Sequence, residues 1–298
     1  MISLESLFDL GFDAHFHGPW LLAGLVGFGL LVGVLTGLFG VGGAFLITPL
    51  LNVGFGIPYQ LSIGSGLCFT IGTSSSGMRR HLRLGNVELR LALYLAVTSI
   101  VGALGGASLN RFVEVQLGQS SYTLVMHSLF IILLGATAFA VGKRNSTRHS
   151  GKSPLQRLAI GPSIDLPGAG LTGLSLPGVC AVGLGIGLLG GMMGIGGGVL
   201  FMPLLILVVG LTPHQSVGTS LAVVLCSSTA GALKYGWHGN VNLCIVMSLL
   251  VSSVFGVQIG AWICHRLHAE QLKRYFAFLV LAVMVLIAAK LVWSIRGN

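Results

Sequence analysis

Charged side chains are scarce in this 298-residue chain: they make up 8% of the sequence, whereas 54% of the residues are hydrophobic. A soluble domain of this size needs about 25% charged residues to cover its surface. The composition therefore excludes an ordinary soluble protein. Apolar runs such as 20–39, 91–109 and 241–264 are each long enough to cross a hydrocarbon core about 30 Å thick. This pattern indicates a polytopic helical membrane protein.

Acidic residues are especially few, and all seven lie near the ends of apolar segments or in loops: Glu5, Asp9, Asp13, Glu88, Glu114, Asp165 and Glu270. No carboxylate is therefore expected at mid-membrane, where a proton relay or a sodium site usually needs one. Coupling, if the protein has any, is expected to use backbone oxygens, hydroxyls, a histidine such as His127 or His214, or a proton carried on the substrate.

Several sequence motifs are missing. The pattern GxxxxGK[ST] is absent, so nothing predicts nucleotide hydrolysis. The five cysteines form no CxxC pair and the nine histidines no HxxxH pair, so we predict neither a metal nor a cofactor. A metal-dependent membrane enzyme is a weak alternative, and we predict that the protein is not an enzyme. Residues 1–18 contain no lysine or arginine, so the N-terminus is expected to be retained rather than cleaved as a signal peptide.

The chain contains an internal repeat. A constant offset carries Gly40, Gly42 and Gly43 onto Gly194, Gly196 and Gly197, and it matches further small and polar residues. These pairs are Pro49/Pro203, Gly64/Gly218, Ser65/Thr219, Ser74/Ser228, Arg80/Lys234 and Asn86/Asn240. We predict an N-terminal tail at 1–18, a first transmembrane repeat at 19–142, a cytoplasmic linker at 143–176 and a second transmembrane repeat at 177–298.

Each half reads as five hydrophobic segments, roughly 19–39, 43–57, 60–78, 89–110 and 122–142, then 177–193, 197–211, 215–233, 241–264 and 274–294. Because five is odd, the second half should enter the membrane in the opposite orientation. With the N-terminus outside, the basic residues gather on the inner side, as the positive-inside rule requires. The exceptions are Arg111, Lys234, Lys290 and Arg296. The predicted fold is an all-α membrane protein of two inverted repeats, with a parallel repeat as the alternative.

Glycines gather in two stretches, "GLFGVGGAFLITPLL" at 37–51 and "GGMMGIGGGVLFMPLL" at 190–205. A glycine inside a helix costs about 1 kcal/mol relative to alanine. One helix from 19 to 57 would also be about 58 Å long, which is too long for a single span. Each glycine run is therefore expected to break a helix and fold the chain back as a helix hairpin.

A broken helix exposes amide groups at the start of the next segment, and these amides together with the helix dipole form a site for anions. Paired breaks in two halves also point to the central site of a transporter. We therefore predict a substrate site where the breaks meet. Its amides belong to the neighbourhood of Gly42, Gly43, Gly196, Gly197 and Gly198. The alternative is close packing of helices through small residues.

Hydroxyl side chains crowd the segments after the breaks, "SIGSGLCFTIGTSSSGMRR" and "SVGTSLAVVLCSSTAGALK". Hydroxyls donate hydrogen bonds without adding charge, which suits reversible binding of a small oxyanion. We select Ser65 and Thr219, which follow repeat-matched glycines, as substrate-binding residues, and Arg80 and Lys234 as cations that attract the substrate. The alternatives are hydrogen bonds between helices for the hydroxyls and contact with the membrane interface for the two cations.

The duplicated glycine runs, each followed by "GSGLCFTIGTSSSG" or "GTSLAVVLCSSTAG" and then by "GN", resemble those of the TauE/SafE sulfite exporter family over about 20–112 and 175–266. The resemblance implies a permease of the bacterial inner membrane that moves sulfite or organosulfur anions such as sulfoacetate, usually outward. The first motif departs from the second at Ala44, which stands where the second has a third glycine.

The sequence as a whole predicts a secondary transporter for small sulfur-containing anions, acting by alternating access. Its expected partners are the anionic substrate and the lipid bilayer; nucleic acid is not expected, and a homo-oligomer is left open. The alternatives are a passive anion channel, a transporter of another small anion, and a cation transporter that uses carbonyl groups at the breaks.

Overall fold

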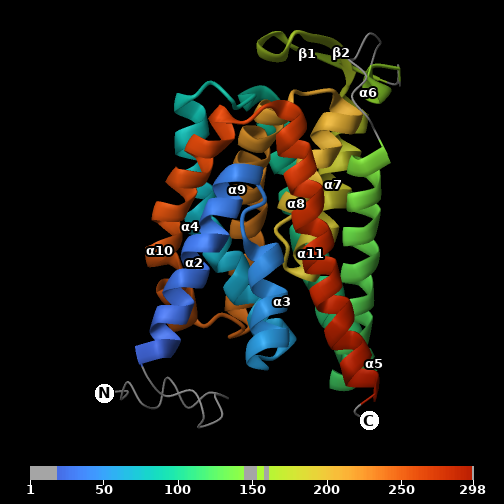
Figure 1. Ribbon diagram of the computed structural model, residues 1–298. Helices are drawn as coiled ribbons and strands as arrows, with labels where there is room; N and C mark the ends of the chain where they lie inside the picture. Colours follow the sequence, from blue (N-terminus) through green and yellow to red (C-terminus); the bar gives the residue numbers. More distant parts are fainter. Residues whose placement is uncertain (1–18, 144–152, 158–160, 297–298) are drawn as a thin grey trace.

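The computed structural model describes residues 19–143, 153–157 and 161–296, and most of them are helical (Figure 1). Within these described ranges, six helices are long and apolar enough to cross a membrane: Leu89–Gly118, Ser121–Val141, Leu176–Met193, Pro213–Trp237, Leu243–Arg266 and Ala269–Ala289. The prediction of a polytopic helical membrane protein is therefore confirmed. The predicted tail at 1–18 lies outside the described residues.

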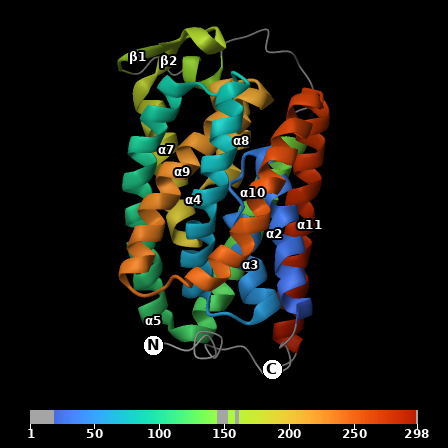
Figure 2. The same cartoon turned by 90° about the vertical axis from the view of Figure 1, so that its left-hand side faces the viewer.

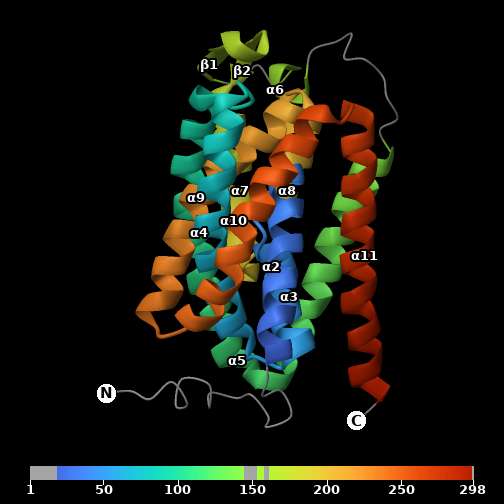
Figure 3. The same ribbon diagram turned by 60° about the vertical axis from the view of Figure 1, so that its left-hand side comes forward.

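The first half contains four labelled helices: α2 (Pro19–Phe39), α3 (Ala44–Phe55), α4 (Tyr59–Arg83) and α5 (Leu89–Lys143). Within α5, Gly118 has φ 71° and ψ 165°, which is not helical. The chain reverses direction within α5, near the lower end of the bundle in Figure 3. The label α5 therefore covers two successive spans rather than one long helix.

The second half repeats this order with shorter pieces. Its elements are α7 (Leu176–Met193), α8 (Gly198–Leu204), a π-helical turn η2 (Leu205–Val209), α9 (Pro213–Trp237), α10 (Leu243–Arg266) and α11 (Ala269–Arg296). Thr212 and Gln215 form a capping box that begins α9. Asn242 begins α10 by accepting the amides of Cys244 and Ile245.

The part of the linker that the structure describes is folded. It forms the short helix α6 (Pro154–Arg157) and two antiparallel strands, β1 (Ser163–Leu166) and β2 (Leu171–Ser175), joined by the 3₁₀ turn η1 (Pro167–Ala169). The hairpin covers one end of the bundle (Figure 1). Gln215 of α9 holds it there by donating to the carbonyl oxygen of Gly168 over 3.2 Å. A loop was expected here, and the local glycine and proline residues instead shape a tight hairpin.

The two halves pack through three main helix pairs: α2 lies along α10, α5 along α7, and α4 along α9. Small residues let these helices approach closely. A Cβ on Gly106 would overlap the carbonyl oxygen of Leu188, and one on Gly260 would overlap that of Val34. Such backbone proximity supplies the van der Waals contact that holds helices together in lipid.

Helices α4 and α9 form the polar centre of the bundle. Their hydroxyl side chains are largely buried, among them Thr70 and Ser74 on α4 and Thr219 and Ser228 on α9. α4 is too polar to count among the six apolar spans of the described chain, but α3, α9 and α10 pack around it. The two helices run in opposite directions, since α4 ends beside the hairpin and α9 ends at the other end of the bundle (Figures 2 and 3).

Candidate functional site

The two glycine runs interrupt helices at matched positions. The helix α2 ends at Phe39 and α3 begins at Ala44, while α7 ends at Met193 and α8 begins at Gly198. The N-cap residues immediately before α3 and α8, Gly43 and Gly197, have φ angles of 92° and 82°. An L side chain is strained at such angles, so these two positions require glycine.

The fold brings the two breaks together between α4 and α9. A Cβ placed on Gly42 would lie 2.7 Å from both Thr70 Cγ2 and Val224 Cγ1. One placed on Gly196 would lie 3.4 Å from Val224 Cγ1 and 3.6 Å from Thr70 Cγ2. Both breaks therefore face the same two side chains. A Cβ placed on Gly198, in the second break, would also overlap the carbonyl oxygen of Val41 in the first break.

Hydroxyl groups of neighbouring helices donate hydrogen bonds to the carbonyl oxygens at the breaks. Thr73 donates to the Gly42 oxygen over 2.7 Å, and its repeat partner Ser227 donates to the Gly196 oxygen over 2.9 Å. Ser220 and Thr48 donate in the same way to the carbonyl oxygens of Gly40 and Gly194. Each of these four carbonyl oxygens therefore already accepts one hydrogen bond from a hydroxyl.

The amide groups at the breaks are differently placed. The Ala44 amide donates to Thr70 Oγ1 over 3.0 Å. Within the part of the chain that the structure describes, the amides of Gly42, Gly43 and Gly197 have no hydrogen-bond acceptor. Free N–H groups beside a helix N-terminus suit an anion.

Two serines that sequence reasoning did not select stand beside the breaks. Ser74 and Ser228 are fully buried, and among the described residues neither hydroxyl has a hydrogen-bond partner. Ser74 Oγ lies 3.2 Å from the position of a Cβ on Gly42, and such a Cβ on Gly196 would overlap Ser228 Oγ. The two serines occupy matching positions in the two repeats. This match was the feature of the sequence from which they could have been selected.

The structure does not bring Ser65 and Thr219, the serine and threonine selected from the sequence, to the breaks. Ser65 Oγ accepts the amide of Asn242 over 2.9 Å, and Thr219 Oγ1 accepts the amide of Glu88 over 3.0 Å. Along α4, Ser65 lies about 13 Å from Ser74 at the rise of an α-helix. In this structure each of the two hydroxyls accepts a hydrogen bond from the main chain of a loop in the opposite half.

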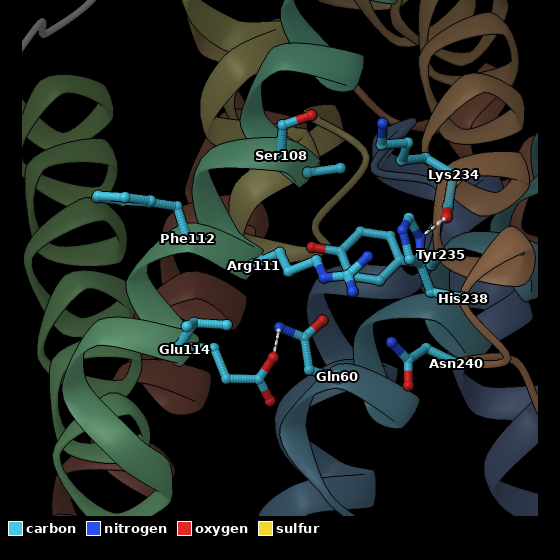
Figure 4. Close-up of a pocket in the computed structure, with 11 residues that line it drawn as sticks. Gln60, Ser108, Arg111, Phe112, Glu114, Lys234, Tyr235, His238 and Asn240 are labelled. Atoms are coloured by element: carbon cyan, nitrogen blue, oxygen red, sulfur yellow. Dashed lines mark hydrogen bonds between the residues drawn. The ribbon is translucent and has the colours of Figure 1, made fainter.

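Arg80 and Lys234, the two selected cations, each line a cavity at the end of their own helix. Arg80 lines a cavity of about 370 Å³ beside α10, together with Arg79 and Arg83. Lys234 lines a cavity of about 640 Å³ beside α5, together with Arg111 and Glu114 (Figure 4). The helices α4 and α9 run in opposite directions (Figure 2). Because each cation lies in the last turn of its helix, the two cavities lie towards opposite ends of the bundle.

A polar network forms one wall of the larger cavity. Gln60 donates to Glu114 Oε2 over 2.9 Å, and Tyr122 donates to Asn110 Oδ1 over 3.0 Å. Asn110 is fully buried and donates in turn to the carbonyl oxygen of Met192 at the end of α7. In Figure 4, Arg111 and Lys234 extend into the cavity from opposite walls. The described residues contain no group of three or more His, Cys, Asp or Glu side chains that could hold a metal ion.

Known proteins that resemble this chain are named probable membrane transporters. The model of the family described as "Sulfite exporter TauE/SafE" matches residues 25–287. The Bacillus subtilis "Probable membrane transporter protein YdhB" is 27% identical over 231 residues, covering 78% of this chain and 85% of the relative. A "Probable membrane transporter protein" of Xylella fastidiosa is 27% identical over 263 residues, covering 87% of this chain and 92% of the relative. No solved structure matches significantly.

The family match spans nearly the whole membrane part of the chain, including both glycine breaks, and it agrees with the six apolar helices. The chain therefore belongs to the TauE/SafE sulfite exporter family and is an integral membrane transporter of that type.

Proposed function

We propose that this protein is a secondary transporter that exports small sulfur-containing anions, such as sulfite or organosulfonates like sulfoacetate, across a bacterial inner membrane. The observation that carries the proposal is the meeting of the two glycine breaks against Thr70 and Val224, with unoccupied amides beside engaged carbonyls. The substrate site would lie at this junction. No catalytic step is part of the proposal.

The proposed architecture is a pair of inverted repeats that rock against each other and expose the junction to either side in turn. Reciprocal contacts support it. Ser65 of the first half holds the Asn242 amide, and the matched Thr219 of the second half holds the Glu88 amide. The opposite directions of α4 and α9 support it as well (Figure 3). The division into 19–142 and 177–298 is part of this proposal.

Charge at the two cavities favours an anion as the substrate. Three arginines and no acid line the cavity at the hairpin end, and Arg111 and Lys234 outnumber Glu114 in the other. Cavities lined by one sign of charge raise the local concentration of the opposite ion. By the positive-inside rule, the hairpin end with its arginines would face the cytoplasm. The more positive cavity, at the hairpin end, would then attract the anion from the cytoplasm, which is the side that an exporter transports from.

Enclosure of the junction favours a transporter over an open channel. Ser74, Ser228 and Thr70 are fully buried there, whereas an open channel would present a water-filled path along such polar side chains. A protein that conducts passively would need such a path. Exposed apolar side chains, such as Phe112 on α5, Phe255 on α10 and Phe278 on α11, provide the surface that the lipid bilayer would contact.

The proposal is tested by uptake of radiolabelled sulfite and sulfoacetate into proteoliposomes, with and without a pH gradient. Saturable uptake that is stimulated by the same anion on the opposite side supports a transporter. Uptake that rises linearly with concentration would indicate a channel instead. If neither anion moves while the protein remains folded, the proposed substrate class is wrong.

The two cavity cations are expected to act from opposite sides. Arg80→Gln should raise the KM for anion entering at the hairpin end by about three- to tenfold, and Lys234→Gln should do so at the other end, because each removes one attracting charge. Both effects should shrink at high salt. The measurement is initial transport in vesicles of each orientation. Arg266→Gln is the matched control, since Arg266 stacks on Trp262 at 3.9 Å and lines neither cavity. If either substitution raised the KM equally for anion entering from both sides, the assignment of each cation to one end of the transporter would be wrong.

A further inference from the structure

Ser74 and Ser228 are unusual among the buried hydroxyls of the two central helices. Both have no exposed surface and no hydrogen-bond partner among the described residues. A buried hydroxyl without a partner is unfavourable and therefore uncommon in folded proteins. Here the two members of one repeat-matched pair share the defect. Thr36 Oγ1, another hydroxyl without a hydrogen-bond partner in the described structure, lies 3.0 Å from the Cβ position of Gly43 at the first break.

The residues just before these serines have a different role. Thr73 and Ser227 donate to the carbonyl oxygens of Gly42 and Gly196, and so hold the two breaks in shape. Adjacent hydroxyls in each helix thus divide into one that fixes the break and one that is left available. The same division in both halves argues that the available hydroxyls have a ligand.

We propose that the hydroxyls of Ser74 and Ser228 are the two central ligands of the transported anion and bind oxygens of its SO₃ group from the α4 side and the α9 side. This inference rests on the proposed function and names the part of the substrate that is recognised. The free amides of Gly42, Gly43 and Gly197 lie at the same junction and add further N–H donors.

The chemistry of the pair suits this group. A fully deprotonated oxyanion accepts hydrogen bonds and donates none, and each of the two serine hydroxyls has one O–H group that it can donate. Among the described residues, no lysine or arginine is a nearest neighbour of the break glycines Gly42, Gly43, Gly196 and Gly197. The anion is therefore not trapped by a salt bridge and can leave on either side. Sulfite and sulfonates share three oxygens on one sulfur, so two donors from opposite helices can bind both classes through that common group.

Glycine is needed opposite each serine for this geometry. A Cβ on Gly196 would overlap Ser228 Oγ, and a Cβ on Gly42 would lie 3.2 Å from Ser74 Oγ. A side chain at either position would press against the neighbouring hydroxyl. The matched glycine and serine therefore act together in each half. The glycine has no side chain to press against the hydroxyl, and the serine supplies the donor.

The test compares Ser74→Ala, Ser228→Ala and the double variant with the wild-type transporter. Each single change should raise KM about tenfold and the double change about a hundredfold, as expected for lost hydrogen bonds to a charged group. The factor should be the same for sulfite and sulfoacetate, because both lose a contact to the SO₃ group. Entry from either side should be affected equally, unlike the cavity cations.

Thermal unfolding separates a ligand role from a structural one. Removing a hydroxyl that has no partner should leave the melting temperature of the anion-free protein unchanged or raise it. The stabilisation that added sulfite gives the wild type should shrink in the variants. Ser74→Cys and Ser228→Cys, which keep the shape of the side chain but donate weakly, should repeat the effect. Ser128→Ala, whose hydroxyl donates back to Leu124 over 2.9 Å, is the matched control and should change nothing.

The outcomes are distinguishable. If the wild type neither moves nor is stabilised by sulfite or sulfoacetate, the proposed function fails. If the wild type transports them and the serine variants keep its KM, the proposed function stands and the inference is overturned. A marked fall in the melting temperature of both the alanine and the cysteine variants would also overturn it, because the hydroxyls would then have a structural partner.

Discussion

Replacement of Gly64 by alanine is expected to leave little folded protein. A Cβ at this position would overlap the carbonyl oxygen of Asn240 and lie 2.9 Å from its carbonyl carbon, so the main chain of the opposite half would have to move. Gly218→Ala should act alike, because its Cβ would overlap the carbonyl oxygen of Asn86. We expect each substitution to lower the free energy of unfolding by about 4 kcal/mol or more, a loss that only a few kinds of substitution cause.

The measurement is the melting temperature and the monodispersity of the detergent-solubilised protein. Gly105→Ala is the matched control, since a Cβ on Gly105 of α5 would meet nothing within 4 Å. Alanine is favoured over glycine in a helix by about 1 kcal/mol, so this control should melt at the wild-type temperature or above it. A Gly64→Ala protein that melts like the wild type would mean that the two halves are not packed as described.

Replacement of Gly197 by leucine should abolish transport of both sulfite and sulfoacetate. Gly197 has φ 82°, and a Cβ there would lie 2.8 Å from Phe201 and 2.9 Å from Ile186. Backbone strain of about 1–2 kcal/mol adds to these overlaps, so the chain at the break must shift and carry its free amide away from the junction. Gly43→Leu should have the same effect, since its φ is 92° and Phe69 lies 2.7 Å from the Cβ position.

Transport is measured in proteoliposomes, and the fold is checked separately by gel filtration and melting. Gly185→Leu serves as the control for leucine on the same helix hairpin, because a Cβ on Gly185 would meet nothing within 4 Å and the residue is exposed. We expect its flux to match the wild type. Wild-type flux in a folded Gly197→Leu protein would exclude the break from the substrate path.

The positions of the helices were predictable because they depend on local properties. The break between α2 and α3 was expected near Gly43, and the structure places it there. Hydrophobic segments expected at 177–193 and 241–264 correspond to α7 at Leu176–Met193 and α10 at Leu243–Arg266. Apolar length and the need for positive φ belong to single segments, so no knowledge of neighbours was required.

The choice among hydroxyls was not predictable in the same way. Ser65 and Thr219 follow matched glycines, which in the sequence look like parts of the site. Those glycines instead let each central helix approach the opposite half, and the neighbouring hydroxyls bind amides of Asn242 and Glu88. Each of these contacts joins residues far apart along the chain, so the sequence around Ser65 holds no sign of it.

By itself, the sequence determined that this protein lies in a membrane, that its helices break twice at matched glycines, and that cations stand at the ends of its two central segments. These features follow from composition, segment length and backbone angles, which are local. The tertiary structure decided that the breaks meet, and that Ser74 and Ser228 rather than Ser65 and Thr219 stand beside them. That outcome depends on how α4 is rotated against α9, and packing between distant parts of the chain sets this rotation.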